Sequence, residues 1–158
     1  MHLHKYEKYW LIFGGASLIV FLLITGIMAF HYGSHPPSSI KTINYEKVDE
    51  IAPFNNPGVH RVSGKDWDYE GVLVASAFYY NPAELHVPKG SKVKFIITSK
   101  DVIHGFEVAG TNVNMMAEPG YISEYTTTVD KAGDYLIVCN EYCGVGHAQM
   151  HSMLKVVD

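Results

Sequence analysis

The sequence predicts one N-terminal transmembrane helix followed by an all-β sandwich. Residues 10–30 form an apolar run of 21 residues that contains no charged side chain. From about residue 70 onward, short runs of β-forming residues alternate with turn residues at a spacing of about 8–12 residues, which is typical of a sandwich or barrel. No long amphipathic pattern follows the apolar run, so strands rather than helices are expected to build the core.

The apolar run is long enough to cross a bilayer as a helix. At about 1.5 Å per residue its 21 residues span roughly 31 Å, close to the thickness of the hydrocarbon core. The alternative is a secretory signal peptide, whose apolar region is about 7–15 residues long and ends at a small-residue cleavage site. Here the run is longer, and the bulky residues Phe30, His31 and Tyr32 stand where cleavage would occur. We therefore expect an uncleaved, single-pass membrane anchor.

Positive charge predicts the orientation of this anchor. Lys5 and Lys8 precede the run, and the first basic residue after it is Lys41. The positive-inside rule therefore places the N-terminus in the cytoplasm and the rest of the chain on the outer, periplasmic face of the plasma membrane. That outer part, after residue 34, contains 15 acidic and 10 basic side chains. A domain with net negative charge is not expected to bind nucleic acid, which needs clustered basic residues.

Changes in composition divide the chain into three parts. Residues 1–32 hold the predicted helix, residues 33–69 are expected to be a polar linker and domain entry, and residues 70–158 are expected to form the β domain. Alternation and a high content of β-branched and aromatic residues predict the strands of that domain. These strands are expected over residues 71–78, 84–87, 92–98, 105–108, 112–115, 121–129, 134–138 and 153–157.

The last two predicted strands frame the segment CNEYCGVGHAQM, residues 139–150, which contains both cysteines of the chain. Cys139, Cys143, His147 and Met150 are soft or borderline metal ligands within twelve residues. A disulfide between the cysteines suits an oxidising compartment, but it would close a very small ring and stabilise the fold little. It would also leave the histidine and the methionine without a role.

The donor set admits several metal sites. Structural zinc usually takes a second ligand pair farther along the chain, and methionine is a poor zinc ligand. A blue-copper site takes one cysteine, two histidines and a weak axial methionine, which Cys143, His104, His147 and Met150 could supply. That site leaves Cys139 unexplained, whereas two copper ions could share both thiolates as bridges. The residues alone leave the disulfide and single-metal alternatives open.

The pattern Cys-x3-Cys-x3-His-x2-Met in this segment resembles the CuA motif of cytochrome c oxidase subunit II and of nitrous oxide reductase. DVIHGFEV, residues 101–108, is similar to the family segment that carries an upstream histidine ligand. The resemblance implies a cupredoxin-like Greek-key sandwich that holds two copper ions as a dinuclear CuA centre. The ligands it implies are His104, Cys139, the backbone carbonyl of Glu141, Cys143, His147 and Met150.

The single span and the segments KYEKYWL, TSKDVIHGFEVAGTNVN and VCNEYCGVGHAQM together resemble subunit II of the B-type haem-copper oxidases. The resemblance implies a membrane-embedded subunit of cytochrome c oxidase, an oxidoreductase of the respiratory chain. It would accept electrons from a c-type cytochrome and pass them to haem in catalytic subunit I, where oxygen reduction is coupled to proton translocation. The chain itself would be an electron relay without catalytic residues. The alternatives are an anchored periplasmic copper-binding or delivery protein and a nitrous oxide reductase-type CuA module.

Three further residues have expected roles outside the metal-binding pattern. Glu7, within YEKYW, is similar in context to a glutamate at the proton-path entrance of the B-type relatives, although a solvated rim carboxylate is an ordinary feature. Phe78, within AFYYNP, matches an aromatic residue where the cytochrome docks in that family, but such residues usually pack in a core or at an edge. His151 follows Met150 and either touches the ligands or simply begins a strand.

Overall fold

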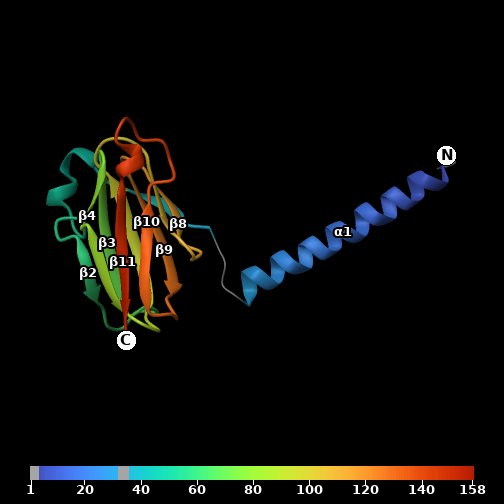
Figure 1. Ribbon diagram of the computed structural model, residues 1–158, viewed down its shortest axis with the longest axis horizontal. Coiled ribbons are helices and arrows are strands. Elements are labelled where there is room, and N and C mark those ends of the chain that lie inside the picture. The colour runs from blue at the N-terminus through green and yellow to red at the C-terminus, as the bar shows by residue number, and fades with distance from the viewer. Residues whose placement is uncertain (1–3, 32–35) are drawn as a thin grey trace. The chain divides into compact units, whose positions relative to one another are not determined.

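The computed structural model describes residues 4–31 and 36–158 (Figure 1). Its contacts divide the chain into two units, Met1–Pro36 and Pro37–Asp158. Residues 1–3 and 32–35 lie outside the described residues. The second of these ranges contains Tyr32 and the start of the expected linker.

Helix α1 (Lys5–Phe30) is the expected membrane-spanning segment. At its N-terminus the His4 side chain accepts a hydrogen bond from the N–H of Tyr6, and the Glu7 carboxylate accepts one from the N–H of His4. This reciprocal capping satisfies amide groups that have no partner inside a helix. The helix has no buried residue and is long and apolar enough to cross a membrane, which confirms the predicted candidate span by length and composition.

The second unit is a sandwich of two β-sheets (Figure 1). The first sheet has the order β1-β9-β6-β3-β2, with β4 paired to β3, and the second has the order β5-β11-β10-β7-β8. The strands of the first sheet are β1 (Ser38–Thr42), β2 (Gly58–Arg61), β3 (Tyr69–Ser76), β4 (Tyr79–Asn81), β6 (Lys92–Ser99) and β9 (Tyr121–Thr128). Those of the second are β5 (Glu84–Pro88), β7 (His104–Val108), β8 (Asn114–Ala117), β10 (Gly133–Val138) and β11 (His151–Val157).

The core forms where the apolar faces of the two sheets meet. On β6 the alternating residues Val93, Phe95 and Ile97 are buried. Phe95 meets Phe106 of β7 with the ring centroids 5.8 Å apart, which joins the two sheets. Such alternation buries one side of a strand and is the pattern that predicted β6.

A second apolar cluster covers the other face of the first sheet. Val72 and Val74 of β3 pack there with Val48, which lies in the short 3-10 helix η1 (Tyr45–Glu50), and with Phe54. Strand β3 is therefore buried on both faces. That burial explains why its sequence is a continuous apolar run rather than an alternating one.

All eight predicted strands are present, with small shifts of their ends. The segment expected to be a linker is different in part, because β1, η1 and β2 belong to the compact β unit that begins at Pro37. Strand β1 pairs with β9 at an edge of the sheet and all five of its side chains are exposed. An edge strand without a buried face shows no apolar periodicity, so pattern reasoning does not find it.

One end of the sandwich gathers the segments that carry the candidate ligands. The loop from β10 to β11, drawn in orange to red in Figure 1, lies at the end of the sandwich opposite the C-terminus. Strand β7 begins at His104, beside the end of β10, with which it pairs. A backbone hydrogen bond of 3.3 Å from the N–H of Cys139 to the carbonyl of Met150 closes the base of the loop. The sheet therefore fixes both ends of the loop.

Candidate metal centre

His104 is the first residue of β7 and its side chain is fully buried. Its Nε2 atom lies 2.8 Å from Oδ1 of Asp101. Because an ionised carboxylate only accepts hydrogen bonds, Nε2 is the donor and Nδ1 is left with its lone pair. Within residues 4–31 and 36–158, this Nδ1 is the buried side-chain nitrogen or oxygen that has no hydrogen-bond partner. An orphaned acceptor of this kind is costly unless it binds something, and a metal ion is a suitable partner.

Asp101 connects His104 to the turn between β3 and β4. Its carboxylate also accepts hydrogen bonds from the N–H of Ala77, at 2.6 Å, and from that of Val102, at 2.7 Å. Burial alone would raise the pKa of Asp101, but the bonds from His104, Ala77 and Val102 outweigh it and hold the pKa below its ordinary value. The carboxylate is therefore ionised at neutral pH, as the assignment of the His104 hydrogen requires.

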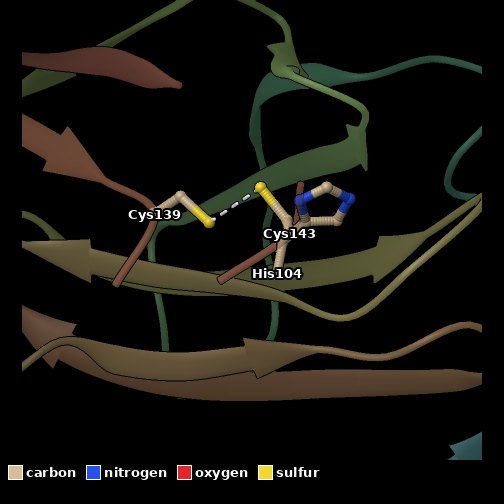
Figure 2. Close-up of side chains that lie close together, drawn as sticks. All are labelled: His104, Cys139 and Cys143. Carbon is tan, nitrogen blue, oxygen red and sulfur yellow. Dashed lines mark hydrogen bonds between the residues drawn. The ribbon is translucent and has the colours of Figure 1, made fainter. Parts of the chain in front are cut away.

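Both cysteines are free thiols that face each other across the site. Their Sγ atoms are 3.8 Å apart, and the side chains are only 7% and 9% exposed for Cys139 and Cys143. A ring nitrogen of His104 and the two sulfurs all lie within 4.8 Å of one another. Figure 2 shows the two sulfurs joined by the dashed line, with the imidazole of His104 beside Cys143. Three candidate ligands from two separate segments thus converge on one small volume.

The remaining candidate donors lie around the same two sulfurs. Sγ of Cys143 is 3.7 Å from Nδ1 of His147 and 3.8 Å from Sδ of Met150. Sγ of Cys139 is 3.1 Å from the backbone carbonyl oxygen of Glu141. The Glu141 side chain is not part of this arrangement, as the resemblance implied. All six expected donors are therefore brought together, and which of them bind a metal stays a prediction.

The surroundings of the Cys143 thiol favour its protonated form in the metal-free protein. Burial, and then the neighbouring Cys139, raise the pKa of Cys143 to about 11. Tyr80 lies behind the site and donates a hydrogen bond of 2.5 Å to the carbonyl of Gly105, and burial raises its pKa. A bound cation would favour the thiolate form of the cysteines, because metals bind thiolates and displace the proton.

Phe78 holds the ligand loop in place by close packing. A Cβ atom at Gly146 would clash with the ring and Cβ of Phe78, and one at Gly144 would lie 2.9 Å from the same ring. Gly144 also has a φ of 131°, a conformation that side-chain-bearing residues rarely adopt. The glycines let the loop lie flat on Phe78, which is half-buried. The structure thus gives Phe78 a packing role beside the site, while its role in cytochrome docking stays a prediction.

A hydrogen-bond network fixes the first part of the loop. The Asn140 amide donates to Oε2 of Glu107, at 3.0 Å, and to Oδ1 of Asn114, at 3.1 Å. These bonds connect the loop to β7 and β8. Gly105 lies against Asn140 so closely that a Cβ atom there would overlap the asparagine side chain. Only glycine permits this approach next to His104.

Sequence reasoning missed Asp101, Asn140 and the packing of Phe78 on the glycines. The Asp-x-x-His spacing is present in the sequence, and a carboxylate three residues before a ligand histidine is a usable signal. The contact between Phe78 and Gly146 joins segments far apart in the chain, so no local pattern indicates it.

His151 is exposed at the start of β11, and its Nδ1 lies 2.8 Å from the carbonyl of Gln149. Glu7 belongs to the other unit, where it caps α1.

The donor set fits copper better than a hard cation. Mg²⁺ and Ca²⁺ take oxygen ligands almost exclusively, whereas this site offers two thiols, two imidazoles, one thioether and a single carbonyl oxygen. Soft sulfur and borderline nitrogen donors select copper among the common metals, or zinc where no methionine takes part. The orphaned Nδ1 of His104 and the two unpaired thiols are the places where such an ion would bind.

The sequence is similar to a known family over most of its length. The family described as "Cytochrome C oxidase subunit II, periplasmic domain" matches residues 79–157, a segment that contains all six candidate ligands. "Cytochrome c oxidase subunit 2" from a Thermus thermophilus strain is 39% identical over 153 residues. That alignment covers 96% of this chain and 91% of the relative.

Two solved structures are similar to this fold. A chain of a haem-copper terminal oxidase dimer superposes with a TM-score of 0.79 at 31% identity, covering 97% of this chain and 100% of that chain. The periplasmic domain of subunit II of the Bradyrhizobium japonicum cytochrome oxidase superposes with a TM-score of 0.55 at 22% identity, covering 60% and 87%. The second likeness concerns the fold alone, and together they confirm the predicted cupredoxin-like sandwich.

Proposed function

The chain belongs to the cytochrome c oxidase subunit II family, and on this premise we propose that it is the electron-transfer subunit of a membrane-bound oxidase. It accepts electrons from a c-type cytochrome and passes them to haem in catalytic subunit I, where oxygen is reduced and protons are pumped. The observation that carries the proposal is the convergence of His104, Cys139 and Cys143 within 4.8 Å. Two thiols in one small site exceed what a mononuclear copper site needs.

Six donors are proposed to hold two copper ions. The thiolates of Cys139 and Cys143 would be shared by the ions, and His104 and His147 would each supply one imidazole nitrogen. The sulfur of Met150 and the carbonyl oxygen of Glu141 would complete the donor set. When bound, such a dinuclear centre supplies one-electron redox chemistry in which the electron is shared between two metals. Because a shared electron changes each bond little, the protein needs to rearrange little during transfer.

The chain's own contribution is to hold the donors still and to exclude water. Met150 is 3% exposed and His104 is fully buried, so bulk solvent has little access to these two donors. Asp101 fixes the orientation of His104, and the packing of Phe78 on Gly144 and Gly146 fixes the loop. Both constraints come from the protein itself, which favours a site whose geometry is set by the fold.

The sequence and the family support a proposal for the membrane placement. We propose that α1 anchors the chain in lipid and packs against the catalytic subunit, with its N-terminus in the cytoplasm and the β unit on the outer face.

Tyr142 and Val145 of the ligand loop are 75% and 95% exposed, respectively. Exposed apolar side chains beside a redox centre suit a short-lived contact with another protein. For Glu7, the role at a proton-path entrance remains a prediction.

Metal counting and electron paramagnetic resonance test this function directly. The full-length chain, purified in detergent and loaded with copper, is expected to hold two ions and to give the seven-line hyperfine pattern of one electron shared between two copper nuclei. A copper delivery protein would instead hold one exchangeable ion with a four-line spectrum, and this result would contradict the proposal. Zinc retained in place of copper would contradict it as well.

A further inference from the structure

A groove of about 410 Å³ opens on the outer face of the second sheet next to the ligand loop. It is lined by Leu136, Val138, Cys139, His147, Ala148, Met150 and His151. Three of these residues are candidate metal ligands. The site described above is nearly closed elsewhere, since Cys139, Cys143, Met150 and His104 are each at most 9% exposed. The groove is therefore a place where solvent reaches the edge of the thiol cluster.

His151 lies at the mouth of this groove and is not among the six donors. It is the first residue of β11 and pairs with Val138 of β10. Buried Ser152 and Leu154 alternate with exposed or half-buried His151 and Met153, so His151 lies on the outer face of the sheet. Its Nδ1 lies 2.8 Å from the carbonyl oxygen of Gln149, which can only accept. Nδ1 is therefore the donor, and Nε2 has the lone pair that a metal ion can use.

A copper ion on its way to the thiols has to exchange ligands. A bare cation cannot enter a site of this kind, because losing its ligands without replacement is very costly. An imidazole nitrogen at the mouth removes that obstacle, since it can replace one ligand of the carrier while the ion is still in contact with solvent.

We propose that this groove is the route by which copper(I) enters the site and that Nε2 of His151 is the first protein atom to bind it. The inference rests on the proposed function, because it needs the copper site at its inner end. A carrier ligand leaves as the bond from copper to Nε2 forms. The Cys139 thiol then loses its proton to solvent, its thiolate binds the ion, and the bond to Nε2 breaks. Copper stays copper(I) throughout, so no oxidant or reductant takes part.

Loading kinetics of the full-length protein test the proposal. Metal-free protein in detergent is mixed without oxygen with copper(I) supplied as its acetonitrile complex, and the near-ultraviolet absorbance of copper-thiolate bonds is followed. The variant His151→Asn keeps an amide N–H near the position of Nδ1 and lacks Nε2. We expect it to load about tenfold more slowly, the lower end of effects seen next to metal ligands. The control is His86→Asn, since His86 is an exposed histidine on the same sheet face but outside the groove.

Release distinguishes an entry residue from a seventh ligand. A residue that acts only on the route changes entry and exit by the same factor, so release to bathocuproine disulfonate should slow as much as loading does. Final copper content and affinity should equal those of the wild type. Unchanged loading in His151→Asn, or a change in release alone, would overturn the inference and leave the proposed function standing. Failure of the wild-type protein to take up copper would overturn both.

Discussion

The two halves of the candidate site are held in different ways. His104 stands at the start of a strand, and one carboxylate, Asp101, fixes its ring by a hydrogen bond. The loop that carries the cysteines, His147 and Met150 has little regular structure beyond the 3-10 turn η2 (His147–Gln149). Hydrogen bonds of Asn140 hold the first part of this loop, and van der Waals packing of two glycines on Phe78 holds the part that leads to His147. A change of charge should therefore disturb the strand half most, and a change in side-chain volume should disturb the glycine part of the loop most.

The largest effect is expected where the two halves share the metal. Cys143→Ser replaces a proposed bridging thiolate by a hydroxyl, which is a poor ligand for copper. The variant should lose the dinuclear spectrum and at least half of the bound copper while the β unit stays folded. Metal analysis and circular dichroism check both statements. A variant that keeps two copper ions and the seven-line pattern would remove Cys143 from the bridging role.

Volume should matter most in the loop half. Gly146→Ala places a methyl group against Phe78, and overpacking of this kind costs about 1–3 kcal/mol. Urea unfolding of the metal-free protein should report this loss in the free energy of unfolding. In the double variant with Phe78→Ala the clash is gone, so the added cost of the alanine should largely disappear. Equal costs of Gly146→Ala in both backgrounds would show that Phe78 does not support the loop.

Charge should matter most in the strand half. Asp101→Asn keeps an acceptor near His104 but removes the negative charge, and we expect copper affinity to fall about tenfold. The reduction potential of the bound copper should rise, because a nearby anion no longer favours the oxidised form. Asp130→Asn makes the same change in charge at an exposed residue and is the control. Equal potentials in the two variants would mean that the charge of Asp101 does not act on the bound copper.

The smallest effect concerns the pH dependence of the metal-free protein. The pKa of Cys143 is raised to about 11 from an ordinary value of 9.0. The unfolded chain therefore releases this proton more readily than the folded one, so the stabilising contribution is complete below pH 9 and is lost as pH rises towards 11. Unfolding free energies measured across this window should decline. The decline should be smaller in Cys143→Ser, and an identical decline would assign it to other groups.

How much of each half the sequence predicts depends on how far apart in the chain the contacting residues lie. The spacing from Cys139 to Met150 is local, so the sequence by itself indicates most of the donor set. The residues alone offered His104 only as one possible imidazole, and its place in the donor set needed a resemblance, because nothing nearby in the chain marks it as a partner of the cysteines. Phe78 lies 68 positions before Gly146, so their contact depends on tertiary packing. The strand β1 was missed for a different reason, namely that it has no buried face to leave a pattern.

The closed base of the ligand loop has a consequence for the order of biosynthesis. A nascent chain that has emerged as far as Met150 already carries all six proposed donors. It lacks β11, which pairs with both β10 and β5 and fixes the far end of the loop. The donors are thus synthesised before the strand that arranges them. Capture of copper by the ordered site must wait until translation has passed this strand. A chain interrupted earlier would carry free thiols in a loop whose far end no strand holds in place.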